Sequence, residues 1–231
     1  MKIIVIGLGN FGSALAQKLT DMGNEVIGVD QLMERVNRMK DFLSHVICLD
    51  STDLQAVNNL PLSETDIVVN CIGKDEGASI ITTAVLKRKK VKRIVVRSES
   101  EVHNMVMETM GIEEIMHPED EASGKLAKQL LLKGVVDSFA VTEEYSLIEA
   151  MVPPHFQGKK LNDLKLNKKY DVVLLAVLTE KQKSNGVKSN TSKNHELKEM
   201  AGSETELQEG DIMVMFGQLR KIEKLLEKEE K

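Results

Sequence analysis

The sequence predicts an α/β protein in which a doubly wound parallel sheet is followed by a smaller α+β domain. Three observations predict this fold class. Short apolar runs of strand length alternate with amphipathic stretches of helix length as far as residue 116. The first run ends in a glycine-rich turn, and the second ends on an acid. Beyond residue 134, strand-like runs follow one another without long helices between them.

The first thirty residues form a compact β-α-β unit. Residues 2–6 have the length of a buried strand, 13–22 form an amphipathic stretch that Gly23 closes, and 25–29 are a second strand ending on Asp30. The turn between the first strand and the helix reads Gly7-Leu8-Gly9-Asn10-Phe11-Gly12. A G-x-G-x-x-G pattern in this setting predicts a Rossmann-like domain.

The glycines of this turn predict a phosphate-binding loop. Gly7 allows a tight turn, Gly9 lets backbone approach a phosphate, and Gly12 lets the helix lie close to the sheet. The helix N-terminus then offers unpaired N–H groups to an anion. Asp30 can accept hydrogen bonds from ribose hydroxyls, which disfavours a 2′-phosphate and leaves ATP, ADP, AMP and NAD(H) open.

The alternation continues with four more strands and four more helices. The strands are expected at 45–49, 66–72, 93–97 and 112–116, and the helices at 31–43, 54–60, 78–89 and 101–110. Right-handed crossovers then give the strand order 3-2-1-4-5-6. A further helix, 120–133, ends at Gly134, and its apolar stripe predicts packing on a partner subunit or on the next domain.

From Val135 the pattern is that of an α+β domain, so domains are expected at 1–134 and 135–231. The expected elements are strands at 135–142, 145–152, 171–179 and 211–217 and a helix at 218–228. The polar segment 179–206 predicts a long mobile hairpin loop, because it cannot bury enough apolar surface to become ordered.

Composition excludes several classes of protein. The net charge is −5 and charges of both signs are distributed along the chain, so no nucleic-acid partner is expected. The apolar run 172–178 is far shorter than the roughly 20 residues of a membrane-spanning helix. No signal peptide is recognised, and Cys48 and Cys71 have no metal-site spacing. These features predict a cytoplasmic protein with buried thiols and no direct membrane insertion.

The ordered set of motifs resembles the TrkA/KtrA family, the ring-forming RCK regulators of bacterial potassium transporters. The motifs that carry this resemblance are residues 7–12, 29–30, 50–53, 115–119, 144–146, 158–164 and 207–211. The resemblance covers essentially the whole chain and implies an RCK N-domain followed by an RCK C-domain. It implies a homodimer that assembles into a tetramer or octamer ring. The implied partner is a membrane potassium-translocating subunit of the Trk/Ktr type, which would hold the ring at the inner face of the membrane.

The resemblance also implies an adenine-nucleotide site. The residues that it assigns to this site are Gly7, Leu8, Gly9, Asn10, Phe11, Gly12, Asp30, Gln31, Asp50, Ser51, Thr52, Cys71, Ile72, Gly73 and Arg97. Glu119 matches a glutamate that in some relatives coordinates a cation near the phosphates; alternatively, it is an acid at a helix N-terminus. Asn10 stands where ATP-selective relatives carry an arginine, which argues against a strong ATP preference.

Two other functions stay open at this point. An NAD-dependent oxidoreductase would need a proton donor or acceptor beside the nicotinamide. His103, His155 and His195 are scattered along the chain without a catalytic arrangement, so no catalytic residue is expected. A stand-alone NAD(H) or nucleotide sensor without a membrane partner fits the same residues.

Overall fold

A computed structural model describes residues 1–132, 134–180 and 195–227. The chain divides into two compact units, Met1–Asp120 and Glu121–Lys231, so the boundary lies near the start of helix α6 (Pro118–Leu131). The boundary expected at residue 134 would instead place this helix wholly in the first domain. In the described part of the chain, no helix has both the length and the apolar character needed to cross a membrane.

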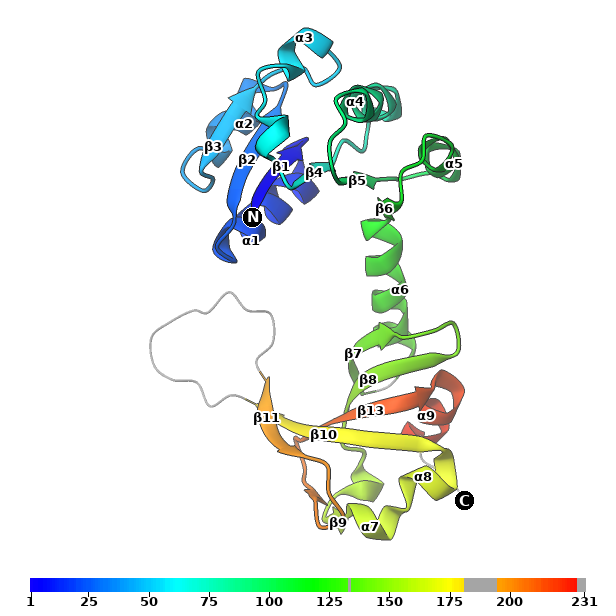
Figure 1. Ribbon diagram of the computed structural model, residues 1–231. Coiled ribbons are helices and arrows are strands. Elements are labelled where there is room, and N and C mark those ends of the chain that lie inside the picture. The colour runs from blue at the N-terminus through cyan, green and yellow to red at the C-terminus, as the bar shows by residue number, and fades with distance from the viewer. Residues whose placement is uncertain (133, 181–194, 228–231) are drawn as a thin grey trace. The chain divides into compact units, whose positions relative to one another are not determined.

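The first unit contains a six-stranded parallel sheet with the order β3-β2-β1-β4-β5-β6 (Figure 1), which confirms the predicted fold class and strand order. Its strands are β1 (Lys2–Ile6), β2 (Glu25–Asp30), β3 (His45–Cys48), β4 (Ile67–Asn70), β5 (Ile94–Arg97) and β6 (Glu114–Met116). The winding direction reverses between β1 and β4, and the carboxyl ends of strands at such a reversal form a ligand-binding crevice.

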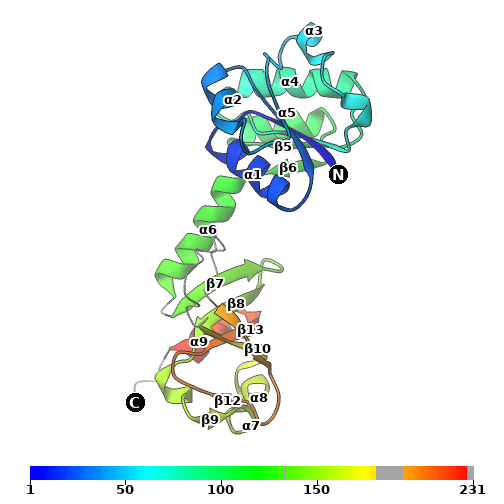
Figure 2. The same cartoon turned by 90° about the vertical axis from the view of Figure 1, so that its left-hand side faces the viewer.

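Helices cover both faces of this sheet (Figure 2). They are α1 (Asn10–Asp21), α2 (Met33–Met39), α3 (Leu54–Val57), α4 (Glu76–Arg88) and α5 (Glu101–Thr109), with a 3-10 turn η1 at Leu62–Glu64. Alternate residues of β1 point to opposite faces. Ile4 and Ile6 pack in one apolar core with Met107 of α5, whereas Ile3 and Val5 pack in another with Ala16 of α1.

Several helices differ from the prediction in their bounds, among them α1 and α2. Helix α1 begins at Asn10 rather than at residue 13, because Gly9 is its N-cap and the last residues of the glycine pattern already wind into its first turn. Helix α2 covers only Met33–Met39 of the expected 31–43. The Asp30 carboxylate accepts a hydrogen bond from the Leu32 N–H at 2.9 Å, which holds the preceding residues in a turn.

The second unit is built on a five-stranded antiparallel sheet with the order β11-β10-β13-β8-β7. Its elements are β7 (Val135–Ala140), β8 (Tyr145–Met151), η2 (Pro154–Phe156), β9 (Lys159–Lys160), α7 (Leu161–Leu164), α8 (Leu166–Tyr170), β10 (Val172–Glu180), β11 (His195–Met200), β12 (Glu206–Leu207), β13 (Ile212–Gln218) and α9 (Leu219–Leu226). Helix α9 buries Ile222 and Leu225 in a core with Met213 and Met215 of β13.

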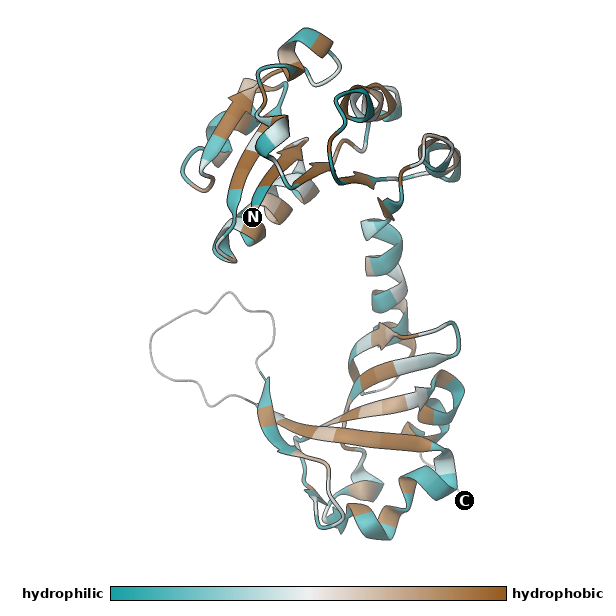
Figure 3. Ribbon diagram, viewed as in Figure 1, coloured by the Kyte–Doolittle hydropathy of each residue, from teal (hydrophilic) through white to brown (hydrophobic). Residues whose placement is uncertain are grey.

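The prediction of a continuous loop over 179–206 is wrong at residues 179–180, 195–200 and 206, which lie in β10, β11 and β12. Residues His195–Met200 form β11, which pairs with β10 in a register that joins Glu180 to His195 and Ala176 to Met200. Most β11 side chains are exposed, so this edge strand is ordered by main-chain pairing and not by apolar burial. Its partner β10 is apolar along most of its length (Figure 3). Residues 181–194 lie outside the described residues.

Candidate functional site

A cavity of about 590 Å³ opens at the carboxyl edge of the parallel sheet. Residues that follow β1, β2, β3, β4 and β5 line it, together with Glu119 at the start of α6. The predicted residues that the structure brings together here are Gly7, Leu8, Gly9, Asn10, Phe11, Asp30, Gln31, Asp50, Ser51, Thr52, Cys71, Ile72, Gly73, Arg97 and Glu119. Among the predicted site residues, Gly12 is the one that does not line the cavity.

The three glycines of the loop have different roles. Gly7 has a φ of +90°, and a Cβ there would lie 3.1 Å from the main chain of Cys71 and Ile72. Gly12 is buried under the loop, where a Cβ would overlap the Gly7 carbonyl oxygen. A Cβ on Gly9 would have no neighbour within 4 Å. Gly7 and Gly12 are therefore required by the backbone conformation of the loop. Of the three glycines, only Gly9 has open space beside it.

The N-terminus of α1 faces this open side of the loop. No side chain in the described part of the chain caps the helix at Gly9, and its first turn contains no acid. The first main-chain N–H groups of a helix have no partner within the helix, and the helix dipole makes this end positive. The loop is therefore suited to bind an anion such as a phosphate.

Asp30 connects the ends of the first two strands. Its side chain is almost fully buried, with 4% of the residue exposed. One carboxylate oxygen accepts hydrogen bonds from the Leu8 N–H at 2.7 Å and from the Arg35 guanidinium at 3.1 Å, and the other accepts from the Leu32 N–H. The carboxylate therefore orders the glycine loop at the edge of the cavity that both line.

Sequence reasoning missed several lining residues. These residues are Ile6, Leu32, Arg35, Arg38, Lys74, Asp75, Ala78 and Glu99. Arg35 and Arg38 are three residues apart on α2, a spacing that puts two side chains on the same face of a helix. Their position just after the acid of β2 was the sequence signal that could have revealed them.

The turn after β3 is held by its own side chains. Hydrogen bonds from the Thr52 hydroxyl and main-chain N–H, at 2.7 and 2.9 Å, lower the pKa of Asp50. The Ser51 hydroxyl lies 2.9 Å from the hydroxyl of Thr82 on α4 in a buried contact. Ser51 thus fixes the turn to α4, while Asp50 and Thr52 are the more exposed members at the cavity.

A buried amide fixes the segment after β4. The Asn70 side chain donates to the Ser79 carbonyl and hydroxyl at 3.0 and 3.1 Å and to the Thr83 hydroxyl at 3.0 Å. Its oxygen accepts from the Ile72 N–H at 3.2 Å. Burial raises the pKa of the neighbouring Cys71 thiol to about 12, so the thiol stays neutral.

Arg97 is paired with two carboxylates at the edge of the cavity. Its guanidinium lies 2.6 Å from Glu99, forms a second ion pair with Glu119, and sits 5.4 Å from the centre of the Phe11 ring. No group of three or more His, Cys, Asp or Glu side chains suited to a metal ion occurs among the described residues. Coordination of a cation by Glu119 therefore stays a prediction.

Comparison with known proteins identifies the family. The family model of the TrkA-N domain matches residues 3–118. The Ktr system potassium uptake protein C of Bacillus subtilis is 34% identical over 173 residues, which are 75% of this chain and 78% of that protein. The chain belongs to the TrkA-N family of potassium uptake proteins. The Ktr system potassium uptake protein A of Vibrio alginolyticus is 33% identical over 171 residues, or 74% and 78% of the two chains.

Solved structures show the fold of this TrkA-N protein over nearly its full length. The RCK domain of GsuK superposes with a TM-score of 0.64 at 14% identity and covers 98% of this chain and 48% of that one. The GsuK channel bound to NAD gives a TM-score of 0.62 at 14% identity, covering 98% and 39%. The fold that the resemblance implied is thereby confirmed.

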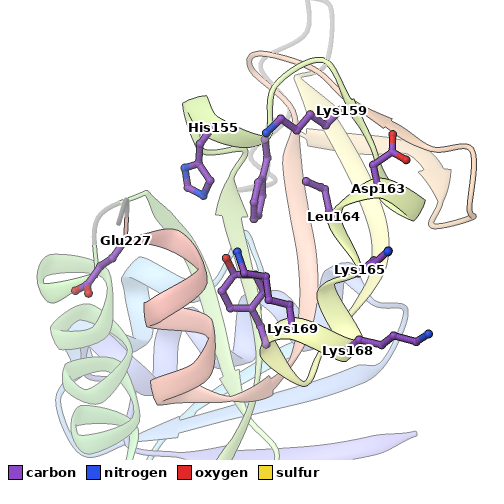
Figure 4. A pocket seen from close by; sticks show the side chains of 10 residues that line it. His155, Lys159, Asp163, Leu164, Lys165, Lys168, Lys169 and Glu227 are labelled. Atoms are coloured by element: carbon purple, nitrogen blue, oxygen red, sulfur yellow. The ribbon is translucent and has the colours of Figure 1, made fainter. Parts of the chain in front are cut away.

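The second unit of this TrkA-N protein has a cavity of its own, of about 870 Å³ (Figure 4). It lies beside η2, α7 and α8 and contains none of the predicted site residues. Its lining includes His155, Lys159, Asp163, Lys165, Lys168, Lys169 and Glu227. Four of these are lysines, so the cavity has a basic lining that the sequence patterns had not indicated.

Proposed function

We propose that this chain is a nucleotide-binding regulatory subunit of a membrane potassium uptake system. The observation that carries the proposal is the convergence of the glycine loop, Asp30 and Arg97 on one cavity at the reversal of strand order. Relatives at 33–34% identity, of which the chain covers 78%, are named as potassium uptake proteins. A regulatory role fits both facts.

The geometry supports a defined placement of the nucleotide. The phosphates would lie on the loop and the N-terminus of α1, where N–H groups and the helix dipole favour negative charge. The ribose would donate hydrogen bonds to Asp30, and the adenine would lie between Gln31 and the turn that begins at Asp50. Arg97 would contribute a positive charge at the phosphates. ADP, ATP, AMP and NAD(H) all satisfy this placement, and a cation at Glu119 would be an additional ligand.

Regulation by such a site needs no catalytic group. A ligand shifts an equilibrium between two conformations by its difference in affinity for them. About 1–3 kcal/mol of coupling, or roughly a five- to 150-fold affinity ratio, is typical. We propose that homodimers assembled into a tetramer or octamer ring pass this shift to the membrane subunit from the cytoplasmic side. The exposed Leu126, Leu130 and Leu131 of α6 support a pairing surface on this helix.

The residues that line the cavity do not support the oxidoreductase alternative. Its lining contains no histidine or tyrosine among the described residues, and its one lysine, Lys74, lies in the loop before α4. The names of the relatives likewise favour regulated transport over hydride transfer. We therefore propose a binding protein and assign no catalytic residue.

Calorimetric titration with ATP, ADP, AMP, NAD and NADH tests the binding site. We expect tight binding of at least one of them to the wild type and at least a tenfold loss, about 1.4 kcal/mol, in Gly9→Asp. Gly9 has open space for the new side chain, so the added charge acts without a steric clash. Gly202→Asp is the matched control, because a Cβ on Gly202 would make only an ordinary contact, 4.0 Å from the Thr205 Oγ1, and Gly202 lies outside both the cavity and α6.

Potassium uptake tests the regulatory role. Cells that lack other uptake systems would receive the cognate membrane subunit together with the wild-type chain, Gly9→Asp or Gly202→Asp. We expect potassium uptake to respond in the same way to the wild type and to Gly202→Asp, and to respond differently to Gly9→Asp. Light scattering on the purified protein should give a tetramer or octamer. Failure of all five nucleotides to bind, or uptake that is indifferent to the chain, would refute the proposal.

A further inference from the structure

We infer that the basic segment at the end of α4 binds the anionic headgroups of a phospholipid membrane. The segment reads Lys87-Arg88-Lys89-Lys90-Val91-Lys92-Arg93, so six of its seven residues are cations in a chain whose net charge is −5. All six cations are exposed. This surface is separate from the nucleotide site, and only the choice of a membrane as its anionic partner rests on the proposed function.

The local backbone keeps these cations at the surface. Helix α4 ends at Arg88. The Lys90 N–H donates to the Lys87 carbonyl oxygen at 2.9 Å, and the φ of Lys90 is +56°, the left-handed conformation that commonly ends a helix. Val91, the one apolar residue of the segment, packs on the apolar core of the first unit. The turn is therefore anchored by Val91, and the charged side chains around it stay in solvent.

The dipole of α4 explains only part of this cluster. Cations near the C-terminus of a helix are stabilising, but the effect falls off within the last turn. Lys87 and Arg88 lie in that turn, whereas the last three cations of the segment lie beyond the helix. Among the described residues, Glu114 is the one carboxylate that forms an ion pair with the segment, at 2.6 Å from Arg93. The fold therefore does not require so many like charges in one place, and they repel one another.

Most of the positive charge of the segment is free to attract an external anion. The Lys87 ammonium donates to the Gly111 carbonyl oxygen at 3.1 Å, and the Lys89 ammonium donates to the side-chain oxygen of Asn58. Both acceptors are neutral, so these contacts orient the lysines without cancelling their charge. The other side chains without a hydrogen bond or ion pair in the described part of the chain are Arg88, Lys90 and Lys92.

The segment lies at the edge of the sheet opposite the nucleotide cavity. Helix α4 begins beside the cavity, which Asp75 and Ala78 line, and the chain leaves its far end to enter β5 at Ile94. The cavity is at the carboxyl ends of the strands, so the start of β5 is at the other edge. None of the six cations lines the cavity. A membrane surface can therefore contact the segment without blocking the nucleotide site.

Anionic lipid is the partner that this chemistry fits best. Clusters of roughly four to eight Lys and Arg side chains beside a membrane bind anionic headgroups. Nucleic acid fits less well, because the segment has no aromatic side chain on which a base would stack and the whole chain is acidic. In the proposed function the chain acts on a membrane subunit, which brings this unit close to a lipid surface.

Co-sedimentation of the purified full chain with vesicles tests the inference without any membrane subunit. The vesicles contain phosphatidylglycerol mixed with phosphatidylcholine, or phosphatidylcholine alone, in salt of about 0.15 M. We expect the wild type to sediment only with the anionic vesicles and to be released as the salt concentration rises. Each cation near an anionic surface contributes roughly fivefold, so the triple variant Arg88→Gln, Lys90→Gln, Lys92→Gln should bind at least about tenfold more weakly.

A second triple variant separates the cluster from net charge. Lys18→Gln, Lys40→Gln, Lys168→Gln removes the same charge from three exposed lysines that are far apart in the sequence. This control should bind the anionic vesicles nearly as well as the wild type. Circular dichroism and nucleotide titration should match the wild type for both triple variants, since none of the replaced residues lines the nucleotide cavity.

Three results would overturn the inference. The first is a wild type that does not bind the anionic vesicles, and the second is an equal loss of binding in the two triple variants, which would indicate net charge alone. The third is a wild type that ignores the vesicles but binds a DNA or RNA oligonucleotide through the segment. All three leave nucleotide binding untouched, whereas the proposed function is refuted only by the nucleotide titration or the uptake measurement.

Discussion

The Asp30 carboxylate accepts a hydrogen bond from the Leu8 N–H at 2.7 Å, so the acid that ends β2 holds the loop that ends β1. The two residues are 22 positions apart in the sequence. Arg35 approaches the same carboxylate oxygen at 3.1 Å. The residue expected to recognise the ribose therefore also determines the shape of the loop expected to bind the phosphates, and the two functions cannot be changed independently.

Replacement of Asp30 should affect both stability and binding. Asp30→Ala leaves the Leu8 N–H buried without its acceptor, and such a loss costs about 1–3 kcal/mol. We expect a lower free energy of unfolding in urea and a loss of nucleotide binding by calorimetry. Asp21→Ala removes an exposed acid at the end of α1 and should change neither. Wild-type stability in Asp30→Ala would show that the loop does not depend on this hydrogen bond.

Gly12 should tolerate no side chain. Gly12→Ala would drive a Cβ into the Gly7 carbonyl oxygen, and overpacking of this kind costs about 1–3 kcal/mol. Gly124→Ala has open space on α6 and should instead be neutral or stabilising by about 0.5–1 kcal/mol. Urea unfolding of the two variants provides the comparison. An unchanged Gly12→Ala protein would mean that helix α1 can shift away from the loop at little cost.

His103 should make stability depend on pH. The residue is buried on α5, and in the described residues neither ring nitrogen has a hydrogen-bond partner. Burial lowers the pKa of His103, and the negative charges of Glu76 and Glu99 oppose this shift in part. The unfolded state then binds more protons than the folded state below about pH 6.5, so stability is lost as the pH falls through this range.

Thermal unfolding measured at several pH values, from roughly 7.5 down to roughly 5, tests this effect. This interval covers the pH range in which an ordinary histidine side chain titrates. We expect the melting temperature of the wild type to fall toward acidic pH and that of His103→Leu to fall less. His45→Gln removes an exposed histidine from β3 and should follow the wild type. Identical pH profiles for the wild type and His103→Leu would contradict the assignment.

The two cysteines should differ sharply in reactivity. Burial raises the pKa of Cys71 to about 12, whereas Cys48 is exposed at the end of β3. The thiolate is the reactive form, so Cys71 should resist alkylation at pH 8. Iodoacetamide labelling followed by peptide mass spectrometry should modify Cys48 first and Cys71 only on unfolding. Rapid labelling of folded Cys71 would show that the segment after β4 opens readily.

The sequence also predicted two buried thiols, and the structure corrects one of them. Cys71 is buried, but Cys48 is exposed because it is the last residue of β3, an edge strand of the sheet. The apolar run predicted a buried thiol, although the predicted order 3-2-1-4-5-6 already placed this strand at the edge of the sheet. The position of the strand in the sheet decided the environment of the thiol.

What the sequence by itself determined follows from local rules. Short apolar runs predicted the strands, and the right-handed crossover rule turned their succession into the order 3-2-1-4-5-6. The resemblance to the TrkA/KtrA family assigned residues that follow successive strands to one nucleotide site. Gly9, Asp30, Asp50, Cys71 and Arg97 do line one cavity. Their use in binding a nucleotide stays a proposal.

The tertiary structure alone decided what depends on contacts between distant residues. It paired Arg97 with both Glu99 and Glu119, and it added the edge strand β11 to β10. None of these features has a local signal, because a side chain's partner and an edge strand's neighbour are set by packing across the whole sheet. Apolar periodicity predicts which face of a helix or strand is buried. In contrast, ion pairs and main-chain hydrogen bonds between elements depend on which elements become neighbours when the chain folds.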